Sequence, residues 1–247
     1  MLDGEEVYQY ETQPDNYDSD GDGLLDGEDI FCDPHVHDVD GDGISDWREG
    51  TYKNYFWMVP HNLSTLIDTI GGKEFAEKRL DSLFTRLDAD YHQDWFAAGN
   101  EPDFQVPWIY NWVEKEQKTN DIISRIIDEM YSSEEDGLPG NDDLGTMGAW
   151  YVFASLGLYP LIPGVGGFST NMPQFVESKI ILGNGNILSI SKDDANGKFL
   201  NKMELNKVPL ESSWVSWSKI KLGGEMKFFT SNSIRKNNFT KEPTSFK

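Results

Sequence analysis

The spacing of apolar residues changes near Pro163, and this change constrains the fold more than any other feature of the chain. Before it, apolar residues recur every three or four positions, which is typical of an amphipathic helix. One such series is Phe75, Ala76, Leu80, Leu83, Phe84 and Leu87. After it, short apolar runs alternate with turn residues, as expected of hairpins. We therefore predict a mainly α chain with a β-rich C-terminal part.

The same patterns predict the positions of individual helices and strands. Helices are predicted from the Gly71-Gly72 break to about residue 87, and over 107–115, 120–131 and 148–156. Strands are predicted over 178–182, 186–191, 203–205, 214–217, 220–222 and 226–229, with the first two joined at Gly183-Asn-Gly185. We expect the basic, polar residues after Ser231 to be frayed.

Residues 1–48 form an acidic, Gly-rich segment that contains a repeat. In both copies, carboxylates occupy loop positions one, three, five, nine and twelve, and Gly occupies position six. This is the spacing with which an EF-hand-type loop surrounds Ca²⁺. The loops resemble thrombospondin type 3-like repeats of secreted bacterial proteins, and a solvated acidic linker is the alternative. The candidate ligands are Asp18, Asp20, Asp22, Asp26, Asp29, Asp38, Asp40, Asp42 and Asp46.

Composition argues against several classes of binding partner, and the N-terminal sequence leaves two cellular locations open. The formal net charge of -22 argues against binding to nucleic acid or to an anionic membrane. Cys32 is the only cysteine, so an internal disulfide is impossible. The sequence has no apolar run that could span a bilayer. Its first residues lack the features of a signal peptide, so we expect either a cytoplasmic protein or the tail of a longer exported chain.

Three separated turns carry the residues that could perform chemistry. Glu49 opens a segment that runs to Asn62, Asn100-Glu101 follows Gly99, and Asp142-Asp143 follows Gly140-Asn. Carboxylates and amides on turns beside helices suit metal-assisted hydrolysis. The alternative is structural, since Asp is common at helix N-caps and Asn-Glu-Pro can form a turn into a helix. We predict that residues 49, 101 and 143 share one cavity.

In this order, the segments Glu49 to Asn62, Gly99 to Trp112 and Asp136 to Pro160 resemble family 92 glycoside hydrolases, the calcium-dependent exo-α-mannosidases. The resemblance extends to about Phe229. It implies that residues 49–163 are the later helices of an (α/α)₆ barrel and that residues 164–247 form a small antiparallel sheet. It also implies that this chain is a C-terminal portion, and that the missing N-terminal part of the enzyme is needed.

The resemblance also implies roles for individual residues. Glu49 matches the general acid, Asp143 the general base with Asp142 beside it, and Asn100, Glu101 and Asp143 the Ca²⁺ ligands. Candidates for contact with the sugar are Trp57, His61 and Trp95, with packing or hydrogen bonding as their alternative role. Glu49 also occupies position twelve of the second acidic loop. Chelation lowers the pKa of a carboxyl group whereas a general acid needs a raised one, so we favour the acid.

The sequence thus predicts a secreted or periplasmic, Ca²⁺-dependent, inverting exo-α-mannosidase that acts on mannose-containing oligosaccharides such as N-glycans. The export signal would lie upstream. One alternative is a non-enzymatic, calcium-stabilised carbohydrate-binding or surface module. Another is a glycosidase of a different α/α-barrel family. The linkage specificity and the oligomeric state are left open.

Overall fold

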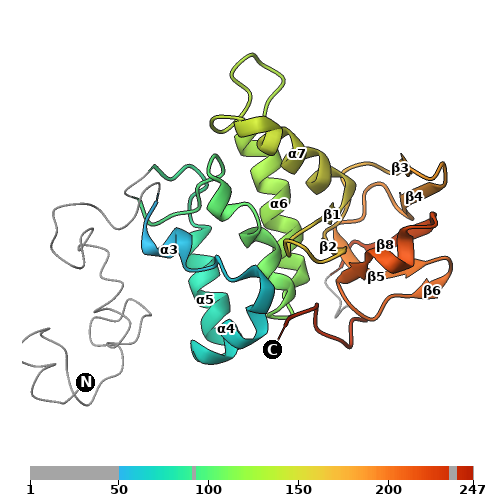
Figure 1. Ribbon diagram of the computed structural model, residues 1–247, viewed down its shortest axis with the longest axis horizontal. Coiled ribbons are helices and arrows are strands. Elements are labelled where there is room, and N and C mark those ends of the chain that lie inside the picture. Colours follow the sequence, from blue (N-terminus) through green and yellow to red (C-terminus); the bar gives the residue numbers. More distant parts are fainter. Residues whose placement is uncertain (1–49, 91–92, 234–237, 247) are drawn as a thin grey trace, which may run out of the picture.

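The computed structural model describes residues 50–90, 93–233 and 238–246. The acidic repeats with their predicted calcium ligands, and Glu49, lie outside the described residues. Figure 1 shows a helical region beside a strand-rich region. Within the described ranges, no helix combines the length and apolarity needed to cross a membrane.

The helical region contains five α-helices joined by short 3₁₀ turns. The α-helices are α3 (Tyr52–Tyr55), α4 (Leu63–Thr69), α5 (Lys73–Leu83), α6 (Glu116–Met130) and α7 (Thr146–Leu156). The 3₁₀ helices are η2 (Pro60–Asn62), η3 (Glu101–Asp103), η4 (Val106–Asn111) and η5 (Asp143–Gly145). The helices predicted after the Gly71-Gly72 break, over 120–131 and over 148–156 are confirmed as α5, α6 and α7, although α5 ends at Leu83 rather than near residue 87. The predicted helix at 107–115 is the shorter η4.

Burial explains the position of α6, the longest of these helices. Its isoleucines at positions 122, 123, 126 and 127 are all buried, so the three- and four-residue spacing places them on one face. They belong to a core that also contains Trp57, Trp108 and Trp150. This core draws on α4, α5, α6 and α7, and on the turns between them.

Two sheets form the strand-rich region. The first has the order β1-β2-β7, with β1 (Leu158–Tyr159), β2 (Gly167–Thr170) and β7 (Trp214–Ser216). The second has the order β3-β4-β8-β5-β6, with β3 (Glu177–Ile181), β4 (Ile187–Lys192), β5 (Phe199–Leu205), β6 (Val208–Pro209) and β8 (Gly224–Ser231). The predicted hairpin at residues 183–185 is confirmed, because β3 and β4 pair antiparallel from Glu177↔Ser191 to Ile181↔Ile187.

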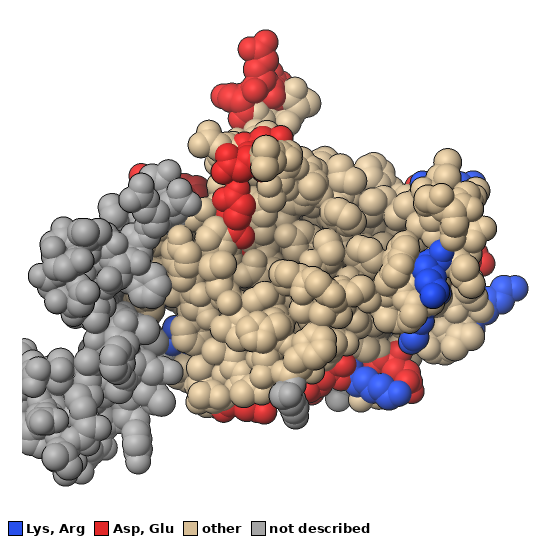
Figure 2. Space-filling view, viewed as in Figure 1, with Lys and Arg blue, Asp and Glu red and all other residues tan. Residues whose placement is uncertain are grey.

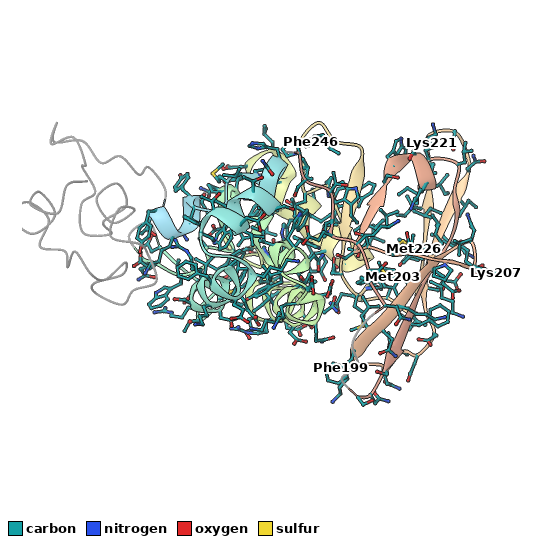
Figure 3. All side chains as sticks on the ribbon, turned by 90° about the horizontal axis from the view of Figure 1, so that it is seen from below. Phe199, Met203, Lys207, Lys221, Met226 and Phe246 are labelled. Atoms are coloured by element: carbon teal, nitrogen blue, oxygen red, sulfur yellow. The ribbon has the colours of Figure 1, made fainter. Side chains whose placement is uncertain are left out.

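The prediction of one small antiparallel sheet was wrong, because β4 and β8 pair in parallel. Strand β8 enters between β4 and β5, after the chain has crossed to the first sheet and formed α8 (Trp217–Ile220). Met226 of β8 faces Ile190 of β4 and is fully buried with Met203 of β5. Figure 3 shows these two methionines inside the sheet, with Lys207 at its far edge. Local patterns reveal strands but not which strand inserts between two others.

The strand predicted at 220–222 was also wrong. The backbone N–H of Lys221 donates to the carbonyl of Trp217 at 2.8 Å, which closes the helical turn of α8. Ile220 is 1% exposed and Leu222 is 72% exposed. Over three residues, one buried apolar side chain followed by an exposed one fits a helical turn as well as a strand.

The C-terminal tail is anchored rather than frayed. The N–H of Thr240 donates to the carbonyl of Glu211 at 2.9 Å, beside the strands. Farther along, the Ser245 hydroxyl accepts from Trp112 Nε1 at 3.0 Å and from the Ser64 N–H at 3.1 Å. Figure 3 places Phe246 on the helical side of the sheet. The tail therefore links the sheet to α4, which composition alone could not reveal.

We expect Ser245→Ala to lower the free energy of unfolding by about 1–3 kcal/mol, because buried Trp112 Nε1 would lose its acceptor. Ser133→Ala, at an exposed serine, is the control and should change it by less than about 0.5 kcal/mol. Urea unfolding followed by tryptophan fluorescence measures both. Equal stability of the two variants would show that the anchor contributes nothing.

Candidate active site

A cavity of about 350 Å³ opens where three parts of the helical region meet. One wall is formed by Gly50 and Asn54, the second by a short antiparallel pair of chain segments, and the third by the turn before α7. The lining consists of Gly50, Asn54, residues 87–90, residues 97–101, Met130, residues 139–141 and Asp143. Glu101 and Asp143 therefore share a cavity, as predicted, and Gly50 places the residue after Glu49 in the same wall.

Two glycines allow the carboxylate-bearing turns to touch. A Cβ atom on Gly99 would lie 2.5 Å from the carbonyl oxygen of Pro139, and one on Gly140 would lie 2.8 Å from the carbonyl oxygen of Gly99. Both distances are too short for a side chain, so the backbones themselves are in contact. The glycines that begin the Gly-Asn-Glu-Pro and Gly-Asn-Asp-Asp motifs therefore bring Glu101 and Asp143 to one cavity.

Glu101 presents an unsatisfied oxygen at this site. It begins η3, and its Oε1 atom is buried without a hydrogen-bond partner among the described residues. Asn100, beside it, is 9% exposed, and its backbone N–H donates to the carbonyl of Ala97 at 3.0 Å. A buried carboxylate oxygen without a donor is costly unless a water, a ligand or a cation satisfies it.

Asp143 lies on the exposed side of the cavity, at the start of η5. The next residue, Leu144, has a φ of 61° and a fully exposed side chain. A left-handed leucine is strained, and such strain is concentrated at functional sites. The kink it makes separates Asp143, which faces the cavity, from the start of α7.

Asp142 has a different position from its neighbour. Its Oδ1 atom accepts a hydrogen bond from the Gly148 backbone N–H at 3.0 Å, in the first turn of α7. Its carbonyl accepts from the N–H groups of Gly145 and Thr146. Asp142 is absent from the described lining of the cavity. The structure thus supplies a helix-capping role for Asp142, and its catalytic role stays a prediction.

The predicted sugar contacts lie elsewhere in the described region. Trp57 is 1% exposed and belongs to the helical core. His61 is exposed, and its carbonyl accepts from the Phe246 N–H at 2.9 Å. Trp95 is half-buried, and its carbonyl accepts from Asn54 Nδ2 at 2.6 Å. None of the three is among the described lining residues.

Sequence reasoning missed several residues of this site. Asp88 and Asp90 line the cavity on a segment that pairs with the Gly99 side, through an antiparallel bridge between Asp88 and Ala97. Asp103 lies behind the wall, where burial raises the pKa of its carboxyl group to about 7 although hydrogen bonds from Ala97 and Asn54 lower it. Asp103 is part of the Asn-Glu-Pro-Asp run, but nothing in its spacing distinguishes a buried carboxylate from a helix-starting one.

The donor set at the cavity suits a hard cation. In the described ranges, no group of three or more His, Cys, Asp and Glu side chains is close enough to hold a metal ion unaided. The cavity nevertheless combines the orphaned Glu101 Oε1 with Asn100 and Asp143, and all their side-chain acceptors are oxygens. Ca²⁺ accepts carboxylate, amide and water oxygens in flexible geometry. These residues therefore fit Ca²⁺ if water or a sugar supplies the remaining ligands.

Acidic side chains also gather beyond the cavity. Figure 2 shows them at the tip of the segment that projects between α6 and α7. The exposed residues Glu134, Glu135 and Asp136 belong to this segment. The projection leads directly into Pro139 and Gly140, so the charge stands close in sequence to the turn that carries Asp143.

Comparison with known proteins identifies the family. Residues 12–232 match the glycosyl hydrolase family 92 catalytic domain. The chain belongs to this family. The matched model describes a glycosyl hydrolase catalytic domain.

Family 92 relatives share the fold of the chain over most of its length. The family GH92 alpha-mannosidase BT3965 from Bacteroides thetaiotaomicron is 30% identical with a TM-score of 0.69, over 76% of this chain and 26% of that one. The family GH92 inverting mannosidase BT2199 from the same organism is 26% identical with a TM-score of 0.67, over 76% of this chain and 28% of that one.

A curated relative from Arthroderma benhamiae, named an uncharacterized secreted glycosidase, is 33% identical over 132 residues. The aligned region is 53% of this chain and 16% of that protein. The chain therefore spans about a quarter of the solved mannosidases and less of the fungal relative.

Proposed function

We propose that the protein containing this chain is a Ca²⁺-dependent, inverting exo-α-mannosidase that hydrolyses terminal α-mannosides. The observation that carries the proposal is the single cavity lined by Gly50, Asn100, Glu101 and Asp143. The names of the solved relatives, one an inverting mannosidase and one an α-mannosidase also solved with mannoimidazole, support mannose as the sugar.

The proposed mechanism uses two carboxyl groups on opposite faces of the sugar ring. Asp143 accepts a proton from a water molecule as that water attacks the anomeric carbon. Glu49, as the general acid, donates a proton to the departing glycosidic oxygen. Bond formation on one face and bond cleavage on the other invert the anomeric configuration.

Asn100, Glu101 and Asp143 would hold Ca²⁺ at this cavity. When bound, the ion would supply positive charge that orients and polarises sugar hydroxyls. Asp143 can be both ligand and base, because both roles need its ionised form. The residues of the acidic repeats remain candidates for separate calcium sites, as proposed from their spacing.

We also propose that α3–α7 are later helices of an (α/α)₆ barrel, with a domain boundary near residue 163 and the acidic repeats as a separate unit before residue 49. Helix α7 supports this proposal, because apolar residues lie on more than one of its faces. Met147, Trp150 and Ala154 are buried, whereas Tyr151 and Val152 are 39% and 54% exposed. A helix that is apolar on opposite faces normally packs against neighbours on both. The rest of the enzyme would supply the second neighbour.

The protein is proposed to work outside the cytoplasm, in the periplasm or after secretion. The fungal relative is named a secreted glycosidase, which supports this location. Calcium is also plentiful outside cells, where weak sites of 10⁻⁴–10⁻³ M affinity, of the order seen in extracellular calcium modules, stay occupied.

Removing calcium is expected to abolish activity. With the complete protein and an aryl α-mannoside, EDTA should lower kcat at least about 100-fold, and excess Ca²⁺ should restore it. The control is the same chelation followed by added Na⁺ at matched ionic strength. Full activity in EDTA would exclude a metal in the mechanism, and release of a different hexose would exclude the mannosidase. Calcium-dependent binding of mannosides without hydrolysis would favour the carbohydrate-binding module.

A further inference from the structure

Asp103 connects two walls of the cavity from behind. Its side chain is fully buried at the end of η3, two residues after Glu101. Its Oδ2 atom accepts from the Ala97 backbone N–H at 2.8 Å and from Asn54 Nδ2 at 3.0 Å. Ala97 lines one wall and Asn54 lines another, so one carboxylate oxygen holds both.

Asn54 extends this connection to the start of the described chain. Its Oδ1 atom accepts from the Thr51 N–H at 2.8 Å and from the Thr51 hydroxyl at 3.1 Å. Its Nδ2 group donates to the Trp95 carbonyl as well as to Asp103. Thr51 directly follows Gly50 of the cavity wall, and Thr51, Asn54 and Asp103 are all at most 2% exposed.

Stabilising the fold is a poor explanation for this network on its own. Asp103 forms no ion pair among the described residues, and its Oδ1 atom is buried there without a hydrogen-bond partner. Burying a carboxyl group under these conditions destabilises a fold, and an apolar side chain of similar volume is often tolerated better. The arrangement therefore calls for an explanation besides the free energy of folding.

We propose that Asp103 is a positioning residue for the mannosidase site, which, with Asn54 and Thr51, fixes the Gly50 wall relative to the Ala97–Glu101 wall. Backbone and side-chain donors from both walls converge on one buried oxygen, so neither wall can shift without breaking a hydrogen bond. The kinetic part of this inference rests on the proposed function, whereas its structural part does not.

The test compares three variants of the complete protein. Asp103→Leu removes the acceptor oxygens at similar volume. Asp103→Asn keeps one oxygen that can still accept from Ala97 and Asn54. Asn111→Ala is the matched control, because Asn111 is a buried polar residue of another network, where it donates to Ser169 and Thr170 and accepts from Thr119.

Hydrogen–deuterium exchange of the backbone is the first measurement. Asp103→Leu should speed exchange at least tenfold in peptides covering 50–54 and 96–101, and leave a peptide covering 147–156 unchanged. Asp103→Asn should exchange like the wild type, and Asn111→Ala should leave both wall peptides unchanged. Unchanged wall peptides in a folded Asp103→Leu variant overturn the proposal, whether or not the protein cleaves any sugar.

Steady-state hydrolysis of an aryl α-mannoside is the second measurement. Asp103→Leu should lower kcat about 100-fold with a smaller change in KM, since a misplacement of about 1 Å costs this much. Asp103→Asn should recover kcat to within about threefold of the wild type, and Asn111→Ala should keep kcat despite a lower melting temperature. Equal kcat losses in Asp103→Leu and Asn111→Ala would mean that the effect is general destabilisation.

Two further results distinguish a variant that fails to fold, or a failure of the proposed function, from a failure of this inference. If Asp103→Leu does not fold, Asn54→Ala tests the same connection, and it should affect the same two wall peptides. Unchanged exchange in that variant overturns the proposal. If the wild type releases no mannose, the proposed function fails, and the exchange measurements still decide the role of Asp103.

Discussion

Asp143→Asn is expected to lower kcat about 1,000-fold while the protein stays folded. The estimate follows from general base catalysis, which contributes roughly 10²–10⁴-fold to a rate. Asp143 is exposed at the cavity, so an isosteric amide should leave the melting temperature unchanged. Hydrolysis of an aryl α-mannoside measures kcat, and added azide should partly restore turnover by attacking in place of the activated water.

Asp142→Asn is the matched control for this prediction. The amide oxygen of Asn can still accept from the Gly148 N–H, so the start of α7 is retained and kcat should fall less than about tenfold. A larger loss in Asp142→Asn than in Asp143→Asn would reverse the assignment of the base. Equal, small losses in both would exclude this turn from the chemistry.

Gly99→Ala is expected to destabilise the protein by about 2–3 kcal/mol and to lower kcat/KM about 100-fold. The added Cβ would lie 2.5 Å from the Pro139 carbonyl oxygen, and neither can rotate away, because the Cβ is fixed by the backbone and the oxygen belongs to it. The turns that carry Glu101 and Asp143 must therefore separate. Urea unfolding and mannoside hydrolysis measure the two effects.

Gly183→Ala provides the control, since a Cβ there meets nothing within 4 Å. It should change stability by less than about 0.5 kcal/mol and leave kcat/KM unaltered. If Gly99→Ala behaves in the same way, the contact between the two turns is not needed to build the cavity.

Local patterns predicted the elements of this chain better than their arrangement. The isoleucines of α6 and the glycines between β3 and β4 act within a few residues of themselves, so their spacing was sufficient. The parallel pairing of β4 with β8 depends on residues more than 30 positions apart. The anchored tail depends on a hydrogen bond between Trp112 and Ser245, which no local pattern can contain.

In the candidate site, too, local motifs were informative and long-range contacts were not predictable. The motifs pointed to Glu101 and Asp143, and the two residues share one cavity because the glycine that begins each motif lets the two turns meet. The sequence could not reveal that Asp103 is buried while Glu101, two positions away, lines the cavity. That difference is set by where Asn54 and Ala97 place their donors, and both belong to other segments.

The backbone contact between Gly99 and Gly140 also limits how the enzyme can diversify. Neither turn can gain a side chain there without moving the other, so useful mutations in these positions would have to arise together. The segment 87–90 lines the same cavity, and each of its residues already carries a Cβ atom. Laboratory selection for altered linkage preference would do best to randomise residues 88–90 and keep both glycines fixed.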